Sequence, residues 1–76
     1  MQDTSAMQRF TDNVARIMTD QGITVTGLAS SSGIGRPGLS RILNGHEGIT
    51  LERAEKIAEA LGVELSELIA KEAVPI

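Results

Sequence analysis

Cysteine is absent from the 76-residue chain, and the aromatic residues are represented by Phe10 alone. Without thiols the protein has no disulfide framework and no thiolate metal site, and a single histidine, His46, is too few to build a metal site. The scarcity of aromatics argues against single-stranded nucleic-acid binding, which depends on stacking bases against aromatic rings. We therefore expect neither a metal nor a cofactor.

Long apolar runs are also missing. None approaches the roughly 20 residues needed to cross a bilayer, and the polar start MQDTSAMQRF lacks the charged and apolar regions of a signal peptide. We therefore expect a cytoplasmic protein. The length suits one small domain, which we expect to span residues 1–76 with its core at about 6–71.

Acidic residues outnumber basic ones, but they are unevenly placed. The net charge is −3, with four arginines against three aspartates in residues 1–46 and three basic residues against seven glutamates in residues 47–76. No acidic residue occurs from Gln21 to His46. An acid-free window in an acidic protein indicates a face that meets an anion.

The spacing of apolar residues predicts an all-α fold of about five short helices. Aliphatic residues supply nearly all of the 41% hydrophobic content, and they recur at three- and four-residue intervals rather than alternating as in strands. Thr50 has the character of an N-cap, and glycines stand where helices should end. The first predicted helix is capped by Thr4 or Ser5 and ended by Gly22, and the others lie at about 26–32, 37–44, 51–61 and 65–69.

The segment SSGIGRPGLSRILNG contains the pattern G-x-G-x-x-G at residues 33–38. That pattern binds dinucleotides only between a strand and a helix of a βαβ unit, for which this chain has neither the strands nor the length. A tight turn between two helices explains the glycines better. Gly33 would close the first helix in the left-handed conformation, Arg36 would stand at the cap of the next helix, and Pro37 would open it. Glycine at position 38 lowers the stability of that helix, so we expect close packing or the close approach of a ligand to require a glycine there.

The spacing of the small and apolar residues resembles that of the lambda-repressor/Cro group, the XRE-type helix-turn-helix regulators. The resemblance covers about residues 10–70, with the helix-turn-helix at about 26–44 and the stretch ITLERAEKIAEALGVELSELI at the place of the family's fourth and fifth helices. The positions that carry the turn are Leu28, Ala29, Gly33, Ile34, Leu39 and Ile42.

The resemblance implies that the helix at residues 37–44 enters the major groove of double-stranded DNA. Its outward residues would read bases, namely Arg36, Pro37, Gly38, Ser40 and Arg41. The start of the preceding helix and the following loop would meet the DNA backbone through Thr24, Thr26, Asn44, Gly45 and His46. Val25 stands where the family often has a long polar residue, so one phosphate contact is expected to be missing.

The implied function is a sequence-specific transcriptional regulator, of the phage, prophage or plasmid repressor type, acting at the nucleoid of a prokaryote. It would bind a palindromic operator as a homodimer. The expected dimer surface is the final helix with the tail, that is Leu65, Leu68, Ile69, Val74 and Ile76. Alternative hypotheses are an antitoxin, a restriction-modification controller, or a protein-interaction module that keeps the scaffold without reading DNA. An enzyme is not expected, because no serine has a histidine base at a defined spacing.

Overall fold

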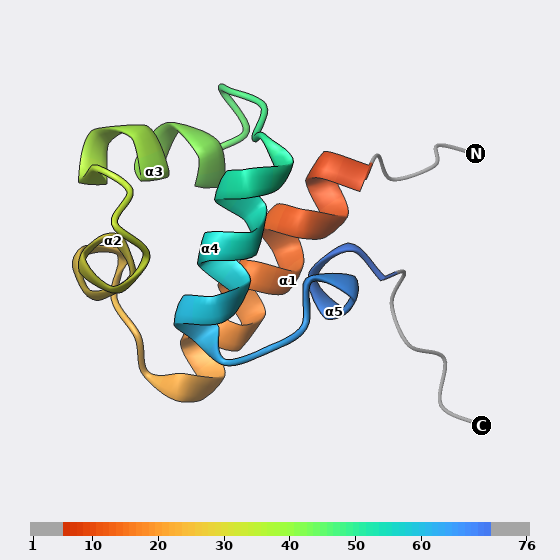
Figure 1. Ribbon diagram of the computed structural model, residues 1–76, viewed down its shortest axis with the longest axis horizontal. Coiled ribbons are helices and arrows are strands. Elements are labelled where there is room, and N and C mark those ends of the chain that lie inside the picture. Colours follow the sequence, from red (N-terminus) through yellow and green to blue (C-terminus); the bar gives the residue numbers. More distant parts are fainter. Residues whose placement is uncertain (1–5, 71–76) are drawn as a thin grey trace.

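The computed structural model describes residues 6–70, which fold into helices packed around one core (Figure 1). No strand occurs within these residues, so the predicted all-α class is confirmed. The helices are α1 (Ala6–Gln21), α2 (Val25–Ser32), α3 (Arg36–Leu43), α4 (Leu51–Leu61) and α5 (Leu65–Ile69).

The core draws on all five helices. Each helix turns a stripe of residues spaced three and four apart toward the centre, as the sequence pattern predicted. α4 packs against α2 and α5, while α1 packs against α3 and α5. The most deeply buried large side chains are Phe10, Val14, Leu28, Leu39, Ile42, Ile57 and Leu68.

Two threonines cap the helices on either side of α3. The hydroxyl of Thr24 accepts a hydrogen bond from the Gly27 amide at 3.0 Å, and that of Thr50 accepts one from the Arg53 amide at 3.2 Å. Each satisfies one of the amides that have no partner within the first turn of a helix. The N-cap expected at Thr50 is confirmed, and α2 begins one residue earlier than predicted.

Candidate nucleic-acid interface

The turn between α2 and α3 is built as the glycine pattern predicted. Gly33 has a φ of 76°, and its amide donates to the Ala29 carbonyl at 3.0 Å. This bond closes α2 in a conformation that is costly for any residue with a Cβ. Ile34 is buried directly after the turn. α3 therefore starts at a fixed place and crosses α2 steeply, as Figure 1 shows with α2 seen end-on beneath α3.

Ser32 supports the same turn and was missed from the sequence. It is the buried polar residue of the described core, and its Oγ accepts a hydrogen bond from the Ile34 amide at 3.3 Å. A serine suggests an exposed position, but its spacing of four from the buried Leu28 places both residues on one face of α2. That spacing is the signal that would have found it.

The beginning of α3 differs from the prediction by one residue. Gly35, not Arg36, is the N-cap; Arg36 is the first helical residue and Pro37 the second. The first turn closes through a hydrogen bond from the Leu39 amide to the Gly35 carbonyl, at 2.9 Å. Pro37 can occupy the second helical position because the amide hydrogen that proline lacks would have no partner within the first turn of the helix. The predicted range 37–44 is thus corrected to 36–43.

The two faces of α3 divide as expected. Leu39 and Ile42 are completely buried, and Leu43 packs against the core from a half-buried position. The opposite face consists of Arg36, Pro37 and Arg41, which are exposed, and Gly38 and Ser40, which are half-exposed. The core contacts hold α3 in place while its outer face stays available to a partner.

The polar side chains of this outer face differ in their hydrogen-bond and ion-pair partners. The Asn44 amide donates to the Ser40 hydroxyl at 3.3 Å, and Arg41 forms an ion pair with Glu47. Within residues 6–70, Arg36 has no hydrogen bond or ion pair of its own. The face is thus modestly basic, with two arginines and one glutamate.

Glu47 lies just past the acid-free window and was not among the predicted site residues. The sequence signal was its position, six residues after Arg41 and two after a glycine able to reverse the chain.

The residues expected to meet the DNA backbone lie on the surface. Thr24, Thr26, Asn44, Gly45 and His46 are all exposed. They come from the start of α2 and from the loop after α3. Val25 packs against the core from a half-buried position, and its aliphatic side chain has no polar atom with which to contact a phosphate.

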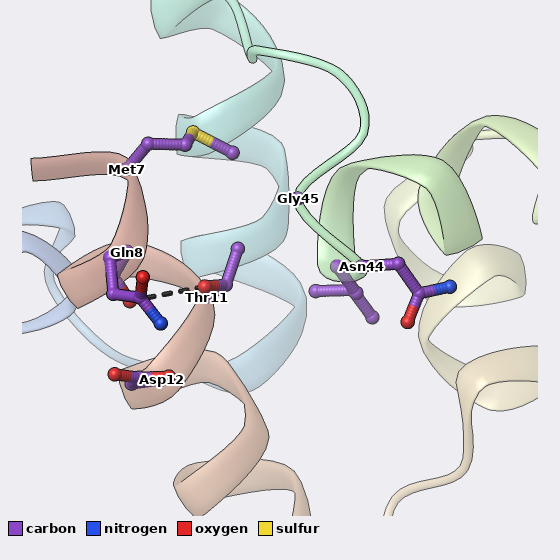
Figure 2. Close-up of a pocket in the computed structure, with 7 residues that line it drawn as sticks. Met7, Gln8, Thr11, Asp12, Asn44 and Gly45 are labelled. Atoms are coloured by element: carbon purple, nitrogen blue, oxygen red, sulfur yellow. Dashed lines mark hydrogen bonds between the residues drawn. The ribbon is translucent and has the colours of Figure 1, made fainter. Parts of the chain in front are cut away.

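An open groove separates the start of α1 from the end of α3 (Figure 2). Its volume is about 440 Å³, and it is lined by Met7, Gln8, Thr11, Asp12, Leu43, Asn44 and Gly45. The Asn44 side chain points away from α1 in Figure 2, and among the described residues of the lining Asp12 alone is charged. An acidic lining disfavours phosphate, so the groove borders the candidate interface without extending it.

The structure describes three of the five residues expected at the dimer surface. Leu65 is half-buried, and Ile69 is 45% exposed. Leu68 is completely buried between α5 and the rest of the core, so it is unavailable to a second subunit and is removed from the predicted surface. Val74 and Ile76 lie outside the described residues. The most exposed large apolar residue among those described is Leu51, at 71%, the first residue of α4.

Residues 6–70 contain no cluster of three or more potential metal ligands. None of the helices in this part of the chain has the length and apolar character to span a bilayer.

Comparison with known proteins identifies the class. The family model described as helix-turn-helix matches residues 14–68, a range that includes α2, α3 and α4 complete. The chain therefore belongs to the XRE-type, lambda repressor-like helix-turn-helix family of DNA-binding transcription regulators, whose members are generally not enzymes. No curated protein and no solved structure matched the chain.

Proposed function

We propose that the protein is a sequence-specific repressor that reads a DNA half-site with the outer face of α3. The main supporting observation is that Leu39 and Ile42, both completely buried, hold α3 against the core. Arg36 and Arg41 are exposed on the opposite side of the helix. In helix-turn-helix proteins the helix after the turn lies in the major groove, and its first residues contact base edges.

Each outer residue has a role that suits its chemistry. Arg41 carries the planar fork that recognises guanine O6 and N7 through two parallel hydrogen bonds. Arg36, at the first position of α3, is placed to bind either a base or a phosphate. Ser40 would bond to a base edge, while Pro37 and Gly38 would set how closely the helix approaches the groove. These roles are supported by exposure and residue type.

Backbone contacts would fix the register of α3 in the groove. Thr24 and Thr26 at the start of α2 would contact one phosphate stretch, and Asn44, Gly45 and His46 would contact the next. All five residues are exposed. The start of α3 would supply further phosphate donors. Gly35 has no side chain to cap the amides of the first turn, and uncapped amides at the start of a helix bind phosphate well.

A homodimer on a palindromic operator completes the proposal. One domain places one short helix in the groove, and regulators of this type gain affinity and specificity by binding two half-sites about one helical turn apart. Leu65 and Ile69 on α5 are the described residues that we assign to the subunit contact. We take residues 1–76 as one domain of a phage, prophage or plasmid-type repressor.

Selection from random duplex DNA tests the proposal. The protein is incubated with the pool at moderate salt, bound duplexes are recovered and sequenced over several rounds, and an Arg36→Ala/Arg41→Ala variant is run in parallel. The proposal predicts an enriched palindrome for the wild type and none for the variant. Absence of enrichment with the wild type would favour a protein-interaction module, and an enriched non-palindromic site would contradict the dimer.

A further inference from the structure

The chain reverses directly after α3 in a way that places Glu47 beside Arg41. Gly45 has a φ of 77°, its amide donates to the Ile42 carbonyl at 3.1 Å, and the His46 amide donates to the Arg41 carbonyl at 2.9 Å. This pair of bonds is the Schellman ending of a helix. It ties residue 46 to the backbone of Arg41, so the next residue along the chain lies next to the arginine side chain.

The two side chains then form a second tie. The Nε–H of Arg41 donates to Oε1 of Glu47 at 2.8 Å. The guanidinium has five N–H donors in a rigid plane, and this bond uses the single donor on Nε. Within residues 6–70 no other hydrogen bond to Arg41 occupies its terminal nitrogens, Nη1 and Nη2. The edge with two terminal nitrogens, which can bind guanine bidentately, therefore remains available.

Folding stability gives little reason for this pair. Both side chains are substantially exposed, at 59% for Arg41 and 42% for Glu47, and exposed ion pairs contribute little to stability because water and salt screen them. A pair on a DNA-facing helix does have a consequence for binding. It restricts a flexible arginine before DNA arrives, which lowers the entropy lost when the arginine binds a base.

Charge gives a second consequence. Glu47 is the first acidic residue after a window, Gln21 to His46, that contains none. A carboxylate at this place repels phosphates and lowers affinity for every duplex, whatever its sequence. The two effects differ in what they change: the oriented base contact raises the ratio of specific to nonspecific binding, whereas the carboxylate lowers the affinity for all duplexes alike.

We propose that Glu47 is a specificity-determining positioning residue that holds the Arg41 guanidinium for base readout and weakens sequence-independent binding to DNA. The inference rests on the proposed function, in which Arg41 contacts a base. Glu47 itself acts through Arg41 and through its charge.

A double-mutant cycle tests the inference. Dissociation constants are measured for the wild type, Glu47→Gln, Arg41→Ala and the double variant, at one salt concentration. The probes are the duplex recovered by selection, the same duplex with the base pair assigned to Arg41 replaced, and a scrambled duplex. Glu59→Gln, on the exposed surface of α4, is the matched control, because it removes the same charge away from Arg41. Thermal melts establish that every variant is folded.

The expected result has three parts. Glu47→Gln lowers discrimination between the first two duplexes by about fivefold to tenfold, within the range that one bidentate contact provides. It also tightens binding to the scrambled duplex more than Glu59→Gln does. In the Arg41→Ala background, Glu47→Gln leaves discrimination unchanged.

The outcomes separate the inference from the proposed function. If Arg41→Ala leaves discrimination intact, the base-reading role of Arg41 is wrong. If Arg41→Ala abolishes discrimination while Glu47→Gln lowers it no more than Glu59→Gln does, the positioning role is overturned. Equal tightening on all three duplexes also overturns it, because Glu47 would then act by charge alone or by withholding Arg41 from DNA.

A measurement without DNA keeps the inference testable if no operator is recovered. In NMR spectra of the free protein, the Nε–H resonance of Arg41 should exchange slowly with water and should exchange faster in Glu47→Gln. Fast exchange in the wild type would contradict the positioning role, whatever DNA the protein binds.

Discussion

The side-chain amide of Asn13, on α1, donates a hydrogen bond to the backbone carbonyl of Leu68, on α5, at 2.8 Å. The same nitrogen lies 3.2 Å from the carbonyl of Ala70, and Nε of Arg9 donates to the carbonyl of Ile69 at 3.1 Å. The last carbonyls of a helix have no partner within it. Two side chains of α1 therefore supply the caps that the five-residue α5 needs to stay on the domain.

Replacement of Asn13 should loosen α5. We expect Asn13→Ala to lower the free energy of unfolding by roughly 1–2 kcal/mol, because part-buried carbonyls lose their donors. Thr19→Ala, on the exposed surface of the same helix, is the control for the higher helix propensity of alanine. Urea unfolding followed by circular dichroism gives both values. Equal stability of the two variants would show that the Asn13 bonds contribute nothing.

The two faces of α3 should respond differently to the same new charge. Leu39→Asp should unfold the domain, because an ionised carboxylate in the core costs several kcal/mol and a domain of this size has only about 5 kcal/mol of stability. Ser40→Asp, the next residue on the half-exposed side, should fold but lose DNA binding through repulsion from phosphates. Thermal melts and a binding titration test the pair. A cooperative wild-type-like melt for Leu39→Asp would contradict the assigned face.

Gly38 offers a prediction in which stability and binding change in opposite directions. A Cβ built at this position meets no atom within 4 Å, so packing inside the domain does not require glycine there. Gly38→Ala should raise the free energy of unfolding by roughly 0.5–1 kcal/mol and weaken binding to the selected duplex, because the methyl group would hold α3 away from the groove.

Chemical denaturation and a binding titration measure the two effects of Gly38→Ala. Thr19→Ala again serves as the control, since Thr19 is near the end of α1, whereas the start of α1 borders α3, and this variant should gain stability without losing affinity. A stabilised Gly38→Ala variant with undiminished binding would show that DNA does not approach Gly38 closely.

The salt dependence of binding should be shallow. The outer face of α3 carries two arginines, and one of them is paired with Glu47. Each phosphate neutralised by a lysine or arginine contributes about 0.9 to the slope of log affinity against log salt, so a dimer should show a slope of magnitude below about 4. Titrations at several salt concentrations provide the slope. A magnitude of about 8 or more would require basic contacts that this account does not include.

The sequence predicted the features that depend on local chemistry. Helix periodicity, the Thr50 cap and the left-handed Gly33 each follow from neighbouring residues, and all three are confirmed. The position of Arg36 was wrong by one residue because proline's effect on its predecessor is a preference, and the first turn closed on Gly35 instead.

Features that depend on contacts between distant residues were beyond a single sequence. Leu68 was assigned to a dimer surface together with the rest of the final helix, whereas packing against the rest of the core buries it completely. Glu47 was counted with the acidic half of the chain, although its position six residues after Arg41 and two after Gly45 was a signal for the turn that brings the two side chains together.

The most direct test of the central claim is to repeat the DNA selection with Arg41→Ala. If the outer face of α3 reads bases, the variant should enrich the same palindrome with information lost at one base pair per half-site, and its affinity for the original duplex should fall by roughly 1–3 kcal/mol. A variant that enriches an unchanged motif with unchanged affinity would show that this face of α3 does not read the operator through Arg41, and the account would be wrong at its centre.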